Sequence, residues 1–241
     1  MKDLKNKVAL ITGGSSGIGY GVALSLLNEG INVAITSRDE ARAKAAAAEL
    51  QKMTTTSAKA IGVMADVRKY ESQQNAVKQV LAEFGQLDIV IANAGLGHFG
   101  SIEELTPEQW QETIDTNLSG VFFSIKSSVE ALKKSKGYFI SISSLAGTNF
   151  FAGGSAYNAS KFGVTGFTQS IMLDLREHNI KVSTIMPGSV ATHFNGHEPD
   201  NSDAWKIQSE DIGELVVSIL KMNERTLPSK IEVRPTMPAS K

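Results

Sequence analysis

Short runs of β-branched and other apolar residues alternate with longer helix-patterned stretches along the whole chain. Several of these runs are uninterrupted apolar stretches, which are typical of strands buried on both faces of a parallel sheet. We expect strands at residues 8–12, 32–37, 58–63, 88–92, 138–143, 182–186 and 231–234. We expect helices at residues 18–28, 39–51, 70–84, 107–134, 155–178 and 209–222. The alternation predicts a doubly wound α/β fold, in which a seven-stranded parallel sheet carries helices on both faces.

The order of these elements also predicts the domain organisation. No break in composition, internal repeat or linker interrupts the chain, so we expect one domain over residues 1–241. The irregular stretch at about 188–208 contains Gly196 and Pro199. Because a loop that long in a compact domain is usually functional or disordered, this stretch is a candidate functional segment. Thr106-Pro107-Glu108-Gln109 has the pattern of a capping box and predicts a helix that begins at Pro107.

The composition excludes several classes of protein. The 24 Lys and Arg residues against 25 Asp and Glu residues give a formal charge of −1, which argues against a nucleic-acid or anionic-membrane partner. The chain has no Cys, which excludes disulfides and thiolate metal sites. The apolar run at 8–11 is too short for a secretory signal, and no window approaches the length of a membrane span. We therefore expect a cytoplasmic protein.

A glycine-rich turn follows the first predicted strand, with the sequence Thr12-Gly13-Gly14-Ser15-Ser16-Gly17-Ile18-Gly19. Glycines at this point permit a tight turn and let the backbone approach a pyrophosphate at the helix N-terminus. Plain strand-to-helix punctuation would use glycines as well. Residues 13–17 also match the G-x-S-x-G elbow of serine hydrolases, with Ser15 as the nucleophile. Only twelve residues precede Gly13 and no His-Gly-Gly-Gly element occurs, so the hydrolase is a minor alternative.

Tyr157 and Lys161 are four residues apart in a predicted helix and share one face of it. A cation beside a phenol favours the phenolate, so we expect Lys161 to lower the pKa of Tyr157. Such a pair is suited to give a proton to a developing alkoxide. A Tyr-x-x-x-Lys pattern by itself is common, and a partly buried Tyr beside a solvated Lys would produce it too.

The remaining motifs occur in an order that resembles the short-chain dehydrogenase/reductase family, from Lys7 to the last predicted strand. The family has a Rossmann-type fold of the kind predicted above. The matching motifs are Thr12-Gly13 with Gly17-Ile18-Gly19, Asp66-Val67, Asn93-Ala94-Gly95, Asn117, Ser143-Ser144, Tyr157 with Lys161, and Pro187-Gly188 with Thr192. One departure is Ala92, at a position where the family often has an Asn.

The resemblance implies roles for four residues of the reaction centre. Tyr157 would be the general acid/base, and Ser144 would polarise the substrate carbonyl. Lys161 would bind the nicotinamide ribose and lower the pKa of Tyr157, while Asn117 would hold a water in a proton relay. The cofactor would carry the hydride. The alternative from another class is a catalytically inactive regulator that only binds the dinucleotide.

The resemblance also implies the cofactor-binding residues, with a preference for NADP(H). Ser37 stands where NAD-preferring relatives have Asp, and Arg38 follows it. Ser37 does not repel a 2′-phosphate, and Arg38 can bind it. At position 16, where some NADP-dependent relatives carry a basic residue, this chain has Ser. The implied cofactor contacts are Thr12, Gly13, Ser15, Ser16, Gly17, Ile18, Gly19, Ser37, Arg38, Asp66, Val67, Asn93, Ala94, Gly95, Tyr157, Lys161, Pro187, Gly188, Val190 and Thr192.

In the family, the segment that corresponds to residues 188–208 is a lid over the substrate. The candidate residues of the substrate pocket are His98, Leu145, Phe150 and Phe194, with Phe99 and Trp205 near them. His193 and His197 have a spacing that binds metals on a helix, but Gly196 and Pro199 argue against a helix there. We expect no metal.

The substrate expected from the resemblance is a small carbonyl compound or alcohol. The alternative is a 3-oxoacyl-(acyl-carrier-protein) reductase, for which Lys133, Lys134, Lys136 and His178 could dock the acidic carrier. The tail at 229–235 lacks the glycine-rich turn of that branch. Relatives usually form tetramers, so we expect a homotetramer or a dimer. The candidate residues of the subunit interface are Phe122, Phe123, Phe162 and Phe167.

Overall fold

The computed structural model describes residues 3–237 and contains one sheet of seven parallel strands. In chain order the strands are β1 (Val8–Ile11), β2 (Asn32–Ser37), β3 (Ala60–Met64), β4 (Ile89–Ala92), β5 (Tyr138–Ile142), β6 (Lys181–Pro187) and β7 (Lys230–Val233). In space their order is β3-β2-β1-β4-β5-β6-β7, and every neighbouring pair is parallel. The predicted fold class is confirmed.

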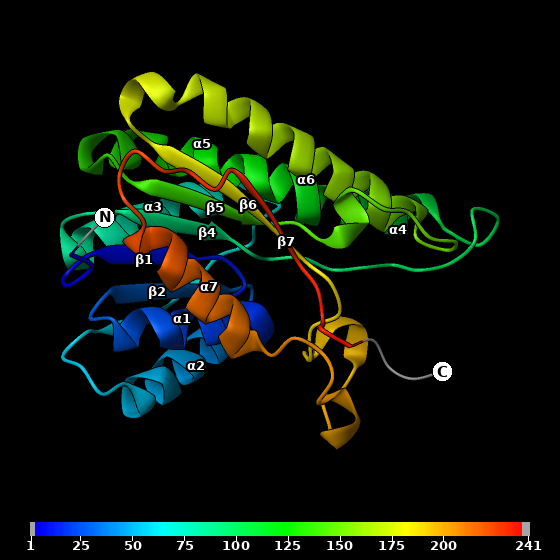
Figure 1. Cartoon of the computed structure of the whole chain (residues 1–241), viewed down its shortest axis with the longest axis horizontal. Coiled ribbons are helices and arrows are strands. Elements are labelled where there is room, and N and C mark those ends of the chain that lie inside the picture. Colours follow the sequence, from blue (N-terminus) through cyan, green and yellow to red (C-terminus); the bar gives the residue numbers. More distant parts are fainter. Residues whose placement is uncertain (1–2, 238–241) are drawn as a thin grey trace.

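Helices cover both faces of this sheet (Figure 1). In chain order they are α1 (Gly17–Asn28), α2 (Glu40–Met53), α3 (Tyr70–Phe84), α4 (Pro107–Ile114), α5 (Gly120–Ser135), α6 (Ser155–Asp174) and α7 (Ser209–Lys221). Helices α1, α2 and α7 pack on one face, and α3, α5 and α6 pack on the other. No helix in residues 3–237 has the length and apolar character that crossing a membrane requires.

Alternate side chains of each strand enter the two cores. In β1, Ala9 and Ile11 belong to the core beneath α1 and α7, whereas Val8 and Leu10 belong to the core beneath α3, α5 and α6. All four are buried, as the continuous apolar run predicts for a strand covered on both faces. The predicted capping box at Thr106 and Gln109 is also present, and α4 begins at Pro107 as expected.

The predicted helix at 107–134 is wrong in one respect, because it is interrupted. Between α4 and α5 the chain forms a π-helical turn at Asp115–Ser119. The turn buries Thr116 and Asn117, and the Asn117 amide makes three hydrogen bonds outside its own helix. Such bulges interrupt helices where a side chain must be aimed at another element, and hydrophobic periodicity does not reveal them. The helix predicted at 155–178 also ends early, at Asp174, and a 3₁₀ turn covers Arg176–His178.

The parallel arrangement brings the carboxyl ends of all strands to one edge of the sheet. The strand order reverses direction at β1, since β2 lies on one side of it and β4 on the other. Crevices at such a reversal are the usual ligand sites of doubly wound sheets. The segment after β6 runs past this edge with two 3₁₀ turns, Phe194–Gly196 and Asn201–Asp203, and Val190 pairs with Ile207 at its base.

Candidate active site

A cavity of about 1250 Å³ opens at the carboxyl ends of the strands. Most of the residues predicted for the site line it. These are Gly13, Ser15, Ser16, Gly17, Ile18, Ser37, Arg38, Asp66, Val67, Asn93, Ala94, Gly95, Ser144, Leu145, Tyr157, Lys161, Pro187, Gly188, Val190, Thr192 and Phe194. The cavity also has a lining that the sequence analysis did not identify, which includes Arg42, Arg68, Asn149, Phe151, Asn195 and Arg234.

The glycine turn is tied to the end of β4. The Thr12 hydroxyl accepts hydrogen bonds from the backbone N–H groups of Asn93 (3.0 Å) and Ala94 (3.1 Å). The Asn93 amide donates to the Thr12 carbonyl at 2.9 Å. Gly13 has a φ of +64°, and a Cβ there would lie 2.9 Å from the Ala94 Cα. Thr12 and Gly19 do not line the cavity, so their contribution is to hold the turn in place.

The turn also leaves room for a phosphate-bearing ligand. Gly17 has a φ of +57°, and a Cβ there would lie 3.3 Å from Thr192. Ser16 precedes α1 and makes no side-chain capping bond to it. Backbone N–H groups at a helix N-terminus attract anions, so the residues present fit the pyrophosphate of a dinucleotide.

Tyr157 and Lys161 lie in the first turns of α6, and Lys161 is buried. Lys161 Nζ donates to the Ile142 carbonyl at 3.0 Å and lies 5.6 Å from the centre of the Tyr157 ring. Burial lowers the pKa of Lys161 to about 8. Burial also raises the pKa of Tyr157, and a hydrogen bond with Ser144 opposes that rise. The predicted lowering of the Tyr157 pKa is therefore wrong for this structure, because burial raises this pKa more than the hydrogen bond with Ser144 lowers it.

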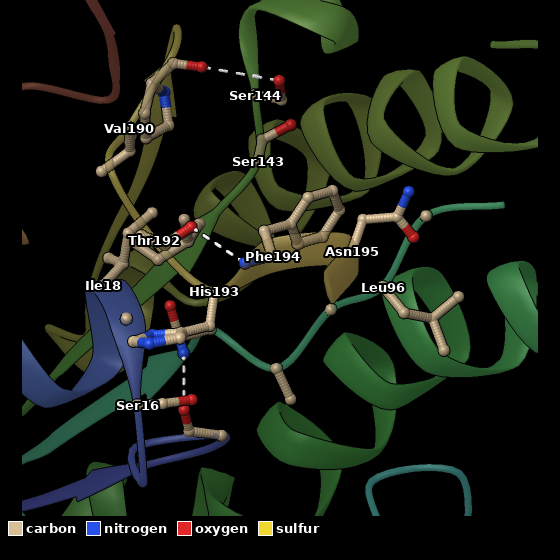
Figure 2. Close-up of a pocket in the computed structure, with 18 of the residues that line it drawn as sticks. Ser16, Ile18, Leu96, Ser143, Ser144, Val190, Thr192, His193, Phe194 and Asn195 are labelled. Carbon is tan, nitrogen blue, oxygen red and sulfur yellow. Dashed lines mark hydrogen bonds between the residues drawn. The ribbon is translucent and has the colours of Figure 1, made fainter. Parts of the chain in front are cut away.

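Ser143 and Ser144 directly follow β5 and lie beside the segment that carries Val190 (Figure 2). Ser144 Oγ accepts from the Ala146 N–H at 3.1 Å and lies 3.5 Å from the Pro187 carbonyl. The Ser143 hydroxyl instead donates to the Lys161 carbonyl at 3.1 Å, which ties β5 to α6. The two serines thus have different environments, and Ser144 is the one hydrogen-bonded to Tyr157.

Asn117 does not line the cavity. Its Oδ1 accepts from the Leu96 N–H at 2.9 Å, and its Nδ2 donates to the Leu96 carbonyl at 2.8 Å and to Ser160 Oγ at 3.0 Å. If Gly95 carried a Cβ, that atom would lie 3.3 Å from Asn117 Oδ1 and 3.7 Å from Lys161 Nζ. The side chain therefore fixes the segment after β4 next to Lys161.

At the other end of the cavity, two arginines lie near two serine hydroxyls. Ser37 ends β2 and accepts from the Asp39 N–H at 3.2 Å. Arg38 is 60% exposed, and its Nη1 lies 3.9 Å from Glu112. Arg42 Nη2 donates to Ser16 Oγ at 3.1 Å. Arg42 was missed, although its spacing of four residues from Arg38 at the start of a helix was a usable signal.

Asp66 is held by a neighbour that the sequence analysis also missed. Arg68 Nη2 lies 2.8 Å from Asp66 Oδ2, and Arg68 Nε is 3.0 Å from Asp66 Oδ1. This pairing keeps the pKa of Asp66 below its usual value. Arg68 also reaches Glu112 Oε1 at 3.2 Å.

Two residues predicted for the substrate pocket lie elsewhere. His98 Nε2 is 2.9 Å from Glu112 Oε2, and His98 does not line the cavity. Phe150 is 86% exposed, and it is Phe151 that lines the cavity. The Asn158 amide donates to the carbonyls of Ala146 and Asn149 at 2.8 Å each, and this fixes the loop with Phe151 on the inner side.

Two of the histidine side chains that the structure describes are hydrogen-bonded to carboxylates, and neither is bonded to a serine. In the described part of the chain, the histidine side chains that are hydrogen-bonded pair with carboxylates: His98 with Glu112 and His197 with Asp203. Within residues 3–237 no hydrogen bond joins Ser15 to a histidine, whereas the hydrolase alternative requires a histidine base at the serine. No group of three or more potential metal ligands occurs within residues 3–237.

Comparison with known proteins gives consistent similarities. Residues 7–203 match the short chain dehydrogenase family. The chain is 36% identical over 221 residues to the trans-4-hydroxycyclohexanecarboxylate dehydrogenase of Sinomonas cyclohexanicum, covering 88% of this chain and 84% of that protein.

Two solved structures show the same similarity in three dimensions. The alcohol dehydrogenase of the archaeon Thermococcus sibiricus, complexed with 5-hydroxy-NADP, has a TM-score of 0.90 at 29% identity, covering 98% of this chain and 99% of that one. The 3-ketoacyl-(acyl-carrier-protein) reductase of Brucella melitensis, complexed with NADH, has a TM-score of 0.86 at 26% identity, covering 97% of this chain and 98% of that one. The resemblance found from the motifs is confirmed: the chain belongs to the short chain dehydrogenase family of oxidoreductases.

Proposed function

We propose that this protein transfers a hydride between NADP(H) and a small carbonyl compound or secondary alcohol. In the reductive direction, a carbonyl, NADPH and a proton give an alcohol and NADP⁺. The observation that carries the proposal is the meeting of Tyr157, Ser144 and Lys161 in one cavity with the glycine turn. The Sinomonas cyclohexanicum relative is named for the oxidation of a secondary alcohol, which supports this substrate class.

The chain's own residues supply the proton and orient the carbonyl. Because burial raises the pKa of Tyr157, its hydroxyl keeps its proton at neutral pH and can give it to the alkoxide that forms. Ser144 donates to the carbonyl oxygen, and Lys161 beneath the tyrosine binds the ribose of the cofactor and favours the phenolate once its proton has left. Asn117 acts in this proposal as a positioning residue, since its hydrogen bonds with Leu96 hold the segment after β4 next to Lys161. A bound nicotinamide supplies the hydride.

The preference for NADP(H) rests on this chain's residues, because the similar structures include both an NADP analogue and an NADH complex. Ser37 and Ser16 offer hydroxyls, and Arg38 and Arg42 offer two guanidinium groups at the same end of the cavity. A 2′-phosphate carries two negative charges, which two guanidinium groups can balance. In this arrangement Arg42 supplies the positive charge that some NADP-dependent relatives carry at position 16, where this chain has Ser.

The segment at about 188–208 acts as the lid in this proposal. Thr192, His193, Phe194, Asn195 and His197 of this segment line the cavity. Its internal contacts join His197 and Lys206 to Asp203, each at 2.5 Å. Figure 2 marks a further contact in it, from the Phe194 N–H to the Thr192 hydroxyl. A segment with its own contacts can move as a unit over the substrate.

A 3-oxoacyl-(acyl-carrier-protein) reductase is a second candidate, favoured by the similarity to the Brucella melitensis enzyme. The candidate docking lysines Lys133 and Lys134 lie in the last turn of α5. In a parallel sheet that turn, which leads into the start of β5, lies at the edge opposite to the cavity. Docking there in one chain would place the carrier far from Tyr157.

We also infer that the protein forms a homotetramer or a dimer. Phe122 of α5 and Phe162 of α6 are both 43% exposed, and Phe122 packs edge-to-face against Phe167. Two neighbouring helices with exposed aromatic rings favour a self-complementary contact. Light scattering at micromolar concentration should give a dimer or larger species, and a monomer would contradict this assembly.

The test of the proposed function is a pair of titrations followed by an assay. NADPH and NADH are added to the pure protein, and binding is followed by calorimetry. We expect NADPH to bind at least about tenfold more tightly, since a charge-assisted contact contributes about 1.5–3 kcal/mol. A panel of ketones and 3-oxoacyl thioesters is then assayed by NADPH oxidation. Failure to bind either cofactor, or NADH binding as tightly as NADPH, would contradict the corresponding part of the proposal.

A further inference from the structure

The ring of Tyr157 lies against other aromatic rings. The centres of the Tyr157 and Phe99 rings are 5.4 Å apart, with an angle of 60° between the planes. The Tyr157 and Phe194 rings are 5.8 Å apart at 58°, and the Phe99 and Phe194 rings are 6.4 Å apart at 64°. Phe151 extends the group, 6.0 Å from Phe99. We call these four rings the aromatic corner.

The aromatic corner joins four separate segments of the chain. Phe99 follows β4, Phe151 follows β5, Tyr157 belongs to α6 and Phe194 to the lid. A hydrogen bond from the Gly100 N–H to the Gly153 carbonyl, 2.9 Å long, ties the first two segments together. Gly97 makes the convergence possible, because a Cβ there would lie 2.7 Å from Phe99 and 3.1 Å from Phe194.

Part of the aromatic corner lines the cavity, and its phenylalanine rings remain partly exposed. Phe151, Tyr157 and Phe194 line the cavity, while Phe99 contacts all three rings without lining it. Phe99, Phe151 and Phe194 retain exposed fractions of 45%, 50% and 38%. Aromatic rings with free faces next to a reactive hydroxyl present apolar area that a ligand can cover.

The shape of the corner favours some ligands over others. Three of these rings, those of Phe99, Tyr157 and Phe194, have their centres within 6.4 Å of one another, so the apolar area that they offer is confined to the surroundings of Tyr157. A ring-shaped apolar group covers such surfaces with edge-to-face contacts. The contact between Phe99 and Phe194 joins the lid to the segment after β4, and an extended polar thioester arm would cover these apolar rings less well than a ring would.

We infer that the substrate is a compact ketone or secondary alcohol whose reacting carbon belongs to an apolar ring or borders one. Phe151 and Phe194 determine this specificity by direct contact with that ring. The inference rests on the proposed function, because it takes Tyr157 as the proton donor.

The experiment compares cyclohexanone and acetophenone with acetone and the acetoacetyl thioester of N-acetylcysteamine. Wild-type protein and three variants are assayed with saturating NADPH. The variants are Phe194→Ala, Phe194→Tyr, which keeps the ring, and Phe150→Ala, which removes the exposed neighbour of Phe151 outside the cavity. Calorimetric binding of NADPH to each variant reports that the protein is folded and loaded.

We expect the ring-bearing ketones to have kcat/KM values at least about tenfold above those of acetone and the thioester. Phe194→Ala should raise KM for the ring-bearing ketones about tenfold with little change in kcat, because a contact made equally in the ground and transition states is lost. Phe194→Tyr should restore KM, and Phe150→Ala should leave it unchanged.

Two results would overturn the inference while the proposed function stands: a thioester preferred to both ring-bearing ketones, or an unchanged KM for cyclohexanone in Phe194→Ala with normal NADPH binding. Absence of NADPH binding in the wild-type protein would instead contradict the proposed function. If NADPH binds but none of the four compounds reacts, the inferred substrate class is also wrong, because cyclohexanone and acetophenone represent it.

Discussion

The two ends of the cavity are built by different means. The end formed by the glycine turn is held by backbone contacts, such as those of Thr12 with Asn93 and Ala94. The end around Tyr157 is built from aromatic side chains on loops and the lid, in contact at 5.4–6.4 Å between ring centres. Backbone contacts suit a ligand of constant structure, whereas side chains on loops can change with the substrate. The first end should therefore tolerate few substitutions, and the second should tolerate many with altered specificity.

The largest effect is expected where the two ends meet. Tyr157→Phe removes the hydroxyl and keeps the ring, so the aromatic contacts and NADPH binding should survive. We expect kcat to fall by about 10²–10⁴-fold, as is typical for loss of a general acid. Steady-state assays with a ketone that the wild-type protein reduces measure kcat, and a calorimetric titration with NADPH measures cofactor binding separately. A variant that keeps more than about a tenth of the activity would show that another group supplies the proton.

A smaller but selective effect is expected at the phosphate-binding end. Ser37→Asp combined with Arg38→Leu adds a carboxylate and removes a guanidinium where the 2′-phosphate would lie. We expect NADPH affinity to fall by about 10–150-fold and NADH affinity to stay the same or rise. Titration of both cofactors into the variant measures this. An equal loss for both cofactors would mean that the region supports the fold rather than selecting the phosphate.

Arg42 offers a finer test of the same end, because it reaches the glycine turn from α2 through Ser16. Arg42→Ala should weaken NADPH binding by about three- to tenfold, and added salt should reduce the difference, since the side chain is exposed. NADH binding should not change, and Arg42→Lys should recover part of the loss. If Arg42→Ala weakens the binding of both cofactors equally, Arg42 stabilises the glycine turn and does not bind the 2′-phosphate.

The smallest effect concerns the enclosed lysine beneath Tyr157. Because the pKa of Lys161 is about 8 in the folded protein and near 10.5 in the unfolded chain, the unfolded chain binds more protons between these values. Stability should thus rise with pH from 8 to 9.5 in the wild-type protein relative to Lys161→Ala, by about 1 kcal/mol or about 2–4 °C in Tm. Thermal unfolding of both proteins at each pH gives this difference. Parallel pH profiles would show that Lys161 is not desolvated in this way.

The same contrast explains what could be predicted from the sequence. The strands, their parallel orientation and the glycine turn follow from hydrophobic periodicity and local motifs, and nearly every residue predicted for the cofactor site lines the cavity. The loops do not follow such rules. Which of the neighbouring residues Phe150 and Phe151 lines the cavity depends on hydrogen bonds from Asn158. The position of His98 depends on Glu112 in α4.

The π-helical turn at Asp115–Ser119 is another feature that local patterns do not reveal. Asn117 could be recognised by its place among the motifs, but its contacts with Leu96 and Ser160 exist only in the folded chain. The direction of the Tyr157 pKa was mistaken for a related reason. Pairing with Lys161 can be seen in the spacing, whereas the degree of burial is a property of the whole fold.

The central claim is that this cavity transfers a hydride from a nicotinamide to a carbonyl carbon while Tyr157 supplies the proton. The most direct test uses NADPH that carries deuterium at the transferable position, with cyclohexanone or any other ketone of the panel that is reduced. Mass spectrometry of the product should find one deuterium on the carbon that bears the hydroxyl, formed at a much lower rate by Tyr157→Phe. An alcohol product without deuterium, or one formed equally fast by Tyr157→Phe, would contradict the account.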